Sequence, residues 1–186
     1  MARVVLGAAV AAFVMLVVGF IFFATPLARL STASLDAPQA AAVQQALSAN
    51  LPKTGTYHVP GTDTQAQTNM YSRGPIATVH YNIHGFAAND VSALGMGLVF
   101  NFIIALLIGA GLIGIDRRVP DFGSRARVAI LVAVAASAFT HLGEPIYFHH
   151  DWGHFIYLFI ADGAALAAAG LVVAWFLPRS RAAPAD

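Results

Sequence analysis

Four long apolar stretches constrain this chain more than any other feature. They run over Val4–Ala24, Ala93–Ile115, Val128–Phe148 and Gly153–Leu177. A helix needs about 20 apolar residues to cross the hydrocarbon core of a bilayer. The 186 residues are 58% hydrophobic and 10% charged, and so short a chain has no interior large enough to hide that much apolar surface from water. The sequence therefore predicts an α-helical integral membrane protein with four transmembrane helices.

The first stretch is interpreted as an uncleaved anchor. Its apolar core is near 20 residues, longer than the roughly 7–15 residues of a signal-peptide core. No clear small-residue cleavage site follows it before Pro26. We therefore expect it to remain as the first helix.

Arginines predict the direction of the helices, because short cytoplasmic loops are enriched in Lys and Arg. The segment between the second and third stretches holds Arg117, Arg118, Arg125 and Arg127, the C-terminal tail holds Arg179 and Arg181, and the N-terminus holds Arg3. All of these fall on one side of a four-helix topology. We expect both termini in the cytoplasm, in the inner membrane of a bacterium, with the other loops facing the periplasm.

These signals divide the chain into segments. We predict helix 1 over residues 1–25, an extracytoplasmic insert over 26–92, helix 2 over 93–116, a basic cytoplasmic loop over 117–127, a hairpin of helices 3 and 4 over 128–178, and a cytoplasmic tail over 179–186. The hairpin carries a His-rich turn at its outer end.

The insert predicts a small α+β unit. A short helix is expected after Asp36, a plausible N-cap, and before Pro52. A weak strand is expected over Gly55–Val59 and a stronger one over Gly74–Gly85, where apolar and polar residues alternate. The intervening "PGTDTQAQTNM" is interpreted as a polar loop.

Polar residues within or beside the apolar stretches are the candidate site. Asp162 lies well inside the fourth stretch, and Asn101 lies at a similar depth in the second. An ionisable side chain in a membrane is by default a functional hypothesis. We expect both to converge with His141, Glu144 and His154 in the outer half of the bundle.

Three interpretations of these residues stay open. In the first, Asp162 is structural, either protonated or hydrogen-bonded to Asn101, Ser137 or a histidine, and holds helices together. In the second, a histidine facing water leads to the buried acid, as in a proton relay or a quinone site.

The third interpretation is a metal site in the turn "THLGEPIYFHHDWGHF". Imidazole and carboxylate groups are ligands for Zn, Cu or Fe ions, and His150 and His154 have the spacing that lets two imidazoles of a helix reach one ion. The candidate ligands are His141, Glu144, His149, His150 and His154. His80 and His84 lie too far apart on an extended strand to chelate one ion as a pair.

The order of elements resembles a group of small four-span bacterial inner-membrane proteins with an extracytoplasmic α+β insert. The resemblance rests on "ANLPKTGTYHVP", the strand "GPIATVHY" and the last helix "DGAALAAAGLVVAW". It implies a fold and a location, and no activity, cofactor or site residue.

The sequence favours a non-enzymatic role. It has no cysteine, which excludes thiolate ligands and thiol nucleophiles, and no phosphate-binding loop, G-x-S-x-G or H-E-x-x-H motif. The formal net charge of +1 gives no field that would attract nucleic acid. We predict a small accessory subunit or assembly factor of a larger membrane complex, for which a respiratory complex is one candidate. The expected partners are the bilayer and, through Gly- and Ala-rich helix faces, other membrane subunits or a second copy. The alternative is a periplasm-facing transition-metal-binding protein.

Overall fold

The computed structural model describes residues 2–178 and divides them into two compact units. The helical unit comprises residues 2–33 and 91–178, and the insert unit comprises residues 34–90. The predicted tail at 179–186, with Arg179 and Arg181, lies outside the described residues.

The helical unit confirms a helical protein with four segments suited to a membrane. The long helices are α1 (Ala2–Phe23), α4 (Val91–Gly114), α5 (Phe122–His141) and α7 (Trp152–Phe176). Among residues 2–178, these four segments, with the short α6 (Gly143–Phe148) following α5, are long and apolar enough to cross a bilayer. Such helices form readily in lipid because each satisfies its own backbone hydrogen bonds.

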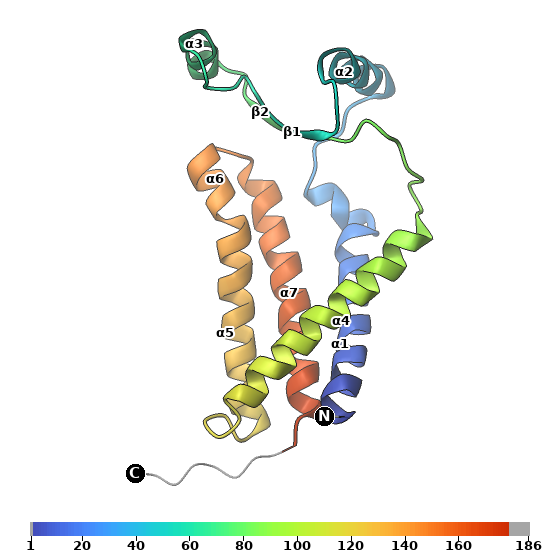
Figure 1. The fold of residues 1–186 in the computed structure, drawn as a ribbon, viewed down its shortest axis with the longest axis vertical. Helices are drawn as coiled ribbons and strands as arrows, with labels where there is room; N and C mark the ends of the chain where they lie inside the picture. The colour runs from blue at the N-terminus through green and yellow to red at the C-terminus, as the bar shows by residue number, and fades with distance from the viewer. Residues whose placement is uncertain (1, 179–186) are drawn as a thin grey trace. The chain divides into compact units, whose positions relative to one another are not determined.

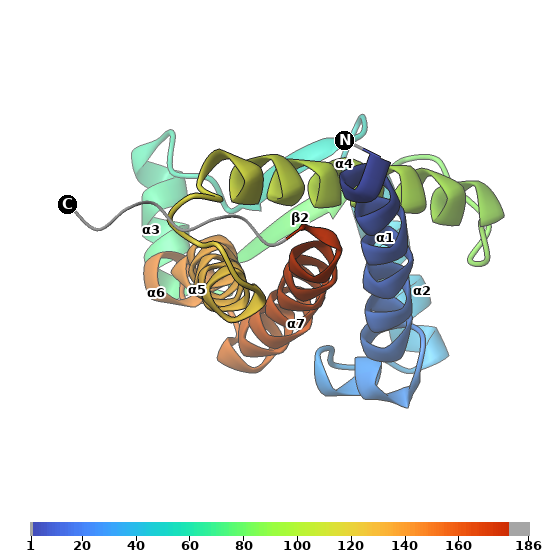
Figure 2. The same ribbon diagram turned by 90° about the horizontal axis from the view of Figure 1, so that it is seen from below.

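Helix α7 holds the bundle together. It packs against α1, α4 and α5, whereas α5 packs mainly on α7, and α4 crosses the bundle obliquely against α1 and α7 (Figures 1 and 2). The core consists largely of small side chains of α1, α4 and α7, including Ala8, Ala11, Ala105, Ala169 and Val173. Small residues allow close approach of helices where lipid removes the hydrophobic drive for association.

Glycines mark the closest contacts between the helices. A Cβ atom added to Gly170 would lie 2.6 Å from the Cβ of Ala129 on α5, and one added to Gly109 would lie 2.9 Å from Val4 on α1. In contrast, a Cβ atom on Gly111 meets nothing within 4 Å. The predicted small-residue faces therefore serve packing within this chain at some positions and leave open space at others.

Helix α5 begins at Phe122, earlier than the predicted start at Val128. Asp121 is its N-cap and accepts a hydrogen bond from the Ser124 backbone N–H, which lowers the pKa of the Asp121 carboxyl together with a hydrogen bond from the Ser124 hydroxyl. The prediction that residues 117–127 form a basic loop is therefore wrong for its second half. Arg125 and Arg127 are helical.

The side chain of Arg125 is buried, with 1% relative exposure. Its Nε donates to the carbonyl oxygen of Val119 at 2.9 Å, and its Nη1 donates to that of Leu177 at 3.1 Å. A cation at the C-terminal carbonyls of α7 is favourable in the field of the helix dipole. Arg125 therefore joins the loop before α5 to the end of α7, and it is not a loop residue exposed to water.

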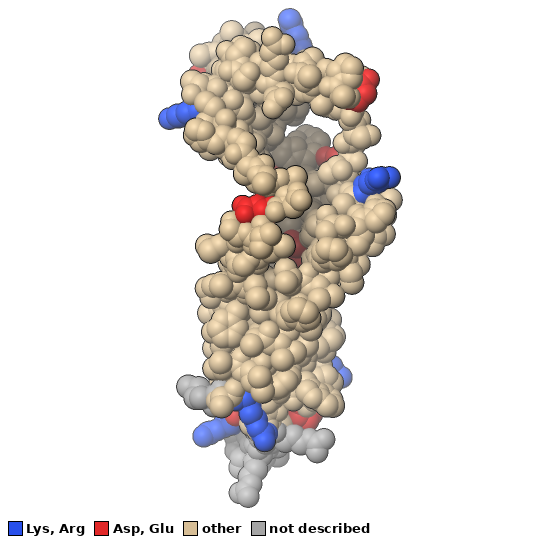
Figure 3. Space-filling view, turned by 90° about the vertical axis from the view of Figure 1, so that its right-hand side faces the viewer, with Lys and Arg blue, Asp and Glu red and all other residues tan. Residues whose placement is uncertain are grey.

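Most of the remaining basic residues of the helical unit lie near one end, and the exception is Arg29, which lies in the short helix after α1. Arg3 begins α1, and Arg117 and Arg118 follow α4, all with exposed side chains. Figure 3 shows basic side chains at this end and a band above it without Lys, Arg, Asp or Glu on the face shown. The start of α1, the end of α4, the start of α5 and the end of α7 lie together there (Figure 1). We call it the arginine end of the bundle, and the opposite end the α6 end.

The insert unit contains two helices and one antiparallel hairpin. Helix α2 (Ala37–Asn50) begins after the predicted N-cap Asp36, which forms a capping box with Gln39. Strands β1 (Gly55–Val59) and β2 (Ala77–Tyr81) pair with Tyr57 opposite Val79. Helix and strands confirm the expected elements, although β2 is shorter than predicted.

The loop predicted between the strands is in part a helix. Helix α3 (Gln65–Arg73) begins after Thr64, whose hydroxyl oxygen accepts from the backbone N–H of Gln67, while the side-chain oxygen of Gln67 accepts from the backbone N–H of Thr64. The Thr-x-x-Gln pattern at 64–67 is the sequence signature of such a capping box. The high polarity of the segment concealed it, because α3 is exposed and has no apolar stripe.

Candidate functional site

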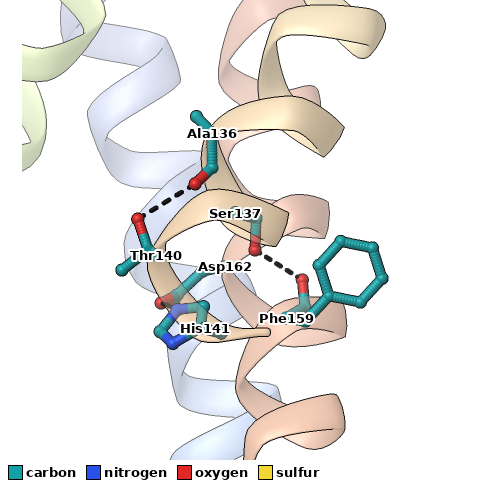
Figure 4. Close-up of polar contacts among 6 residues, drawn as sticks. All are labelled: Ala136, Ser137, Thr140, His141, Phe159 and Asp162. Atoms are coloured by element: carbon teal, nitrogen blue, oxygen red, sulfur yellow. Dashed lines mark hydrogen bonds and ion pairs between the residues drawn. The ribbon is translucent and has the colours of Figure 1, made fainter. Parts of the chain in front are cut away.

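The two ionisable side chains at the centre of the helical unit form a pair. His141 is the last residue of α5, and its Nε2 lies 2.7 Å from Oδ2 of Asp162 on α7 (Figure 4). The His141 side chain is 12% exposed, whereas that of Asp162 is 47% exposed, although Asp162 lies within a helix suited to the membrane. The pair therefore links two helices and still presents a carboxylate to open space.

That open space is a cavity of about 650 Å³ lined by all four long helices. Its wall includes His141, Asp162, Thr140 and Asn101, and most of the other lining side chains are apolar. Of the five residues expected to converge, Asn101, His141 and Asp162 line this cavity, and Glu144 and His154 do not. Cavities of about 300–1,000 Å³ with a few polar groups on an apolar wall are typical of small-molecule sites.

Two hydroxyl groups beside the pair donate to the backbone of their neighbours. Ser137, buried on α5, donates to the carbonyl oxygen of Phe159 at 2.7 Å, and Thr140 donates to that of Ala136 at 2.9 Å (Figure 4). Ser137 adds a second hydrogen bond between α5 and α7, close to that of His141. Because the proton of each hydroxyl is already donated to a carbonyl, each oxygen has only lone pairs left, and these can accept hydrogen bonds.

The other predicted site residues lie around the turn between α5 and α7, in separate arrangements. Nδ1 of His150 lies 3.2 Å from Oε2 of Glu144, and the imidazole is stacked between the rings of Phe148 and Phe155, with centroids at 5.7 and 5.6 Å. His149 has an exposed side chain and a left-handed backbone, with φ of 55°, at the residue that ends α6. This histidine makes the turn toward α7.

His154 has a structural contact. Its Nδ1 lies 2.6 Å from the carbonyl oxygen of Ser31, which follows the short helix η1 (Pro26–Leu30), and the hydroxyl of Tyr157 donates to the carbonyl oxygen of Phe22 at 2.6 Å. The first contact joins the start of α7 to the residue after η1, and the second joins it to the end of α1. Sequence reasoning missed Tyr157, although a tyrosine one turn beyond a histidine on a membrane helix is a visible signal.

The predicted metal ligands do not come together as a set. Within the described part of the chain, no group of three or more His, Asp or Glu side chains could hold a metal ion. His141 pairs with Asp162, Glu144 pairs with His150, and His154 contacts a backbone carbonyl. Metal binding therefore stays a prediction from residue type and spacing, without support from the geometry.

The helical unit therefore has four helices that are candidates to span a membrane, and the His141–Asp162 pair lies on the wall of a cavity that all four helices line. Compared with protein-family models, curated proteins and solved structures, the chain gives no match. The resemblance to small inner-membrane proteins therefore also stays a prediction, and inference about function depends on the cavity.

Proposed function

We propose that this chain is a small integral membrane protein that binds a lipid-soluble ligand in the cavity between α1, α4, α5 and α7. The observation that carries the proposal is Asp162, an ionisable group on a membrane-type helix whose side chain is 47% exposed on the cavity wall. Burying an ionisable group in a bilayer costs several kcal/mol, roughly 2.5–3.5 on insertion scales. A polar headgroup bound in the cavity would give the Asp162 side chain a hydrogen-bonding partner.

The wider role proposed is that of an accessory subunit or assembly factor that works beside a larger membrane complex. In support, α4 has glycines that face open space, such as Gly114, and small residues of this kind let another membrane helix approach closely. Recovery of a stoichiometric membrane partner in mild detergent is the expected result, and a chain that always purifies alone contradicts this role.

The proposed location is the bacterial inner membrane, with the arginine end in the cytoplasm and the α6 end in the periplasm. Arg3, Arg117 and Arg118 support this direction, because positive loops remain on the cytoplasmic side. Labelling of a cysteine placed at exposed His149 by a membrane-impermeant reagent in cells with a permeabilised outer membrane tests it. Labelling at Arg118 instead of His149 reverses the orientation.

The binding proposal is tested by filling the cavity. Gly19 lines it on α1, and a Cβ atom added there meets nothing within 4 Å. The Cβ atom of Gly19→Phe therefore meets no neighbour, and we expect its ring to occupy the cavity. Phenylalanine also has a higher helix propensity than glycine. The matched control is Gly95→Phe on α4, where a Cβ atom also meets nothing and which does not line the cavity.

The measurement is native mass spectrometry of the protein released from membranes in mild detergent, followed by identification of retained lipids. The wild-type chain and Gly95→Phe are expected to retain a lipid-soluble molecule at about one per chain, and Gly19→Phe is expected to lose it. A wild-type chain without a retained molecule, or one retained equally by Gly19→Phe, overturns the proposal.

A further inference from the structure

The cavity wall points to one class of ligand, and this inference rests on the proposed function. We infer that the occupant is an isoprenoid quinol, with its ring beside His141 and Asp162 and its tail along the groove between α4 and α5. Binding alone is inferred, and no electron transfer is assigned to this chain.

Hydrogen-bonding character favours the reduced form over the quinone. Nε2 of His141 and Oδ2 of Asp162 share one hydrogen bond of 2.7 Å. Asp162 has further lone pairs, and the hydroxyl of Thr140 already donates to Ala136. The polar wall therefore combines the acceptors of Asp162 with the amide of Asn101, which both donates and accepts. A quinol O–H can donate to the first and accept from the second, whereas a quinone only accepts.

Charge disfavours fatty acids and anionic phospholipids as occupants. The described residues lining the cavity include no Lys or Arg, and Asp162 places a carboxylate on its wall. An anionic headgroup would lose its hydration and face a like charge without a cation to compensate. A neutral headgroup that donates hydrogen bonds avoids both costs.

Three aromatic side chains favour a planar ring in the headgroup. Phe20 and Phe23 on α1 and Phe100 on α4 line the same cavity as His141 and Asp162. Aromatic rings contact one another in offset or edge-to-face geometry at about 0.5–1.5 kcal/mol beyond area burial. A flat ring with polar edges uses both the aromatic and the acceptor parts of this wall.

A second, apolar groove provides a place for the tail. It has a volume of about 390 Å³ and is lined by α4, α5 and α7, including Leu107, Gly111, Val132 and Ala136. Leu166 lines both this groove and the polar cavity, so the two are neighbours on the bundle. A polar site beside an apolar groove matches a ring with an isoprenoid tail.

The test measures the affinity of the purified full chain for a decyl-tailed benzoquinol and the corresponding quinone. The chain is placed in phosphatidylcholine nanodiscs under anaerobic conditions. The wild-type chain is expected to bind the quinol about tenfold more tightly than the quinone, since two added donor hydrogen bonds are worth about that factor. Asp162→Asn, whose amide offers donors of its own, is expected to remove most of this preference.

Two further variants separate head from tail. Gly111→Phe fills the groove, where a Cβ atom meets nothing, and is expected to weaken binding of the decyl-tailed quinol while leaving a short-tailed quinol unaffected. Gly95→Phe is the control and is expected to bind as the wild-type chain does. Equal or tighter binding of the quinone by the wild-type chain, or unchanged binding by Gly19→Phe, overturns the inference.

The two proposals fail differently. If the chain retains a phospholipid that Gly19→Phe expels, and no quinol binds, the ligand-binding function stands and the quinol is wrong. If neither a lipid nor a quinol is retained, both proposals are wrong.

Discussion

The two ends of the helical unit differ in how far an ionisable side chain is exposed and in what it contacts. At the arginine end, Arg125 is 1% exposed and donates to two backbone carbonyls. At the α6 end, Asp162 pairs with His141 and keeps 47% of its side chain exposed to a cavity. Both residues carry an ionisable group in a helix suited to the membrane, yet only one of them is available to a ligand.

The contrast separates the stabilising role of a charge from a binding role. Arg125 completes the hydrogen bonding of a loop and a helix end, so its removal leaves carbonyls without partners. Asp162 contributes one interhelical hydrogen bond and otherwise faces open space. We therefore expect substitutions at the arginine end to affect stability and substitutions at the α6 end to affect binding.

The largest effect is expected from Arg125→Ala. It removes two charged hydrogen bonds and leaves buried acceptors unpaired, at a cost of about 3 kcal/mol or more. Thermal unfolding in mild detergent measures it. Arg127→Ala, two residues along the same helix with an exposed side chain, is the control and should change little. A similar melting temperature for Arg125→Ala and the wild-type chain would contradict a structural role for Arg125.

A smaller loss of stability is expected from Gly170→Leu. The first added carbon would lie 2.6 Å from Ala129, so α5 and α7 must separate, and overpacking of this kind costs about 1–3 kcal/mol. Gly111→Leu has open space around its new Cβ and should unfold near the wild-type temperature. Equal destabilisation of the two variants would show that the closeness of α5 and α7 at Gly170 does not matter for stability.

Asp162→Asn tests the same comparison at the α6 end of the helical unit. It keeps the shape of the side chain and weakens one interhelical hydrogen bond, which is worth about 0.6 kcal/mol on average in a bilayer. We expect a melting temperature close to that of the wild-type chain together with loss of most of the preference for the quinol over the quinone. A loss of stability as large as that of Arg125→Ala would make the pair a structural element and would remove the distinction.

The smallest effect on stability is expected from a substitution of Asp121, which caps α5 at the arginine end. The pKa of Asp121 is lowered by its hydrogen bonds from Ser124, so the charged carboxylate is preferred in the folded chain. The stabilisation is present above the ordinary pKa of 3.8 and is lost as the pH falls through the lower folded value. Asp121→Ala should flatten the acid limb of the stability curve slightly, and an identical limb would contradict the contribution of this cap.

Local sequence signals predicted the elements better than their contacts. The capping residue Asp36 and the strand at 55–59 could be identified because the deciding interactions lie within a few residues. The start of α5 was predicted too late because Arg125 looks like a loop residue until its distant acceptor, Leu177, is known. The convergence of Asn101, His141 and Asp162 could be predicted from depth alone, but His150 and His154 could not be distinguished by spacing.

The sequence by itself determined that this chain has four helices suited to a membrane. A run of about 20 consecutive apolar residues favours a membrane-spanning helix whatever the neighbouring segments are. The tertiary structure decided which polar groups meet. Rotation and crossing of the helices, set by contacts such as Gly170 against Ala129, place His141 against Asp162 and His154 against a carbonyl. Those rotations depend on packing between residues far apart in the chain, and no short stretch of sequence specifies them.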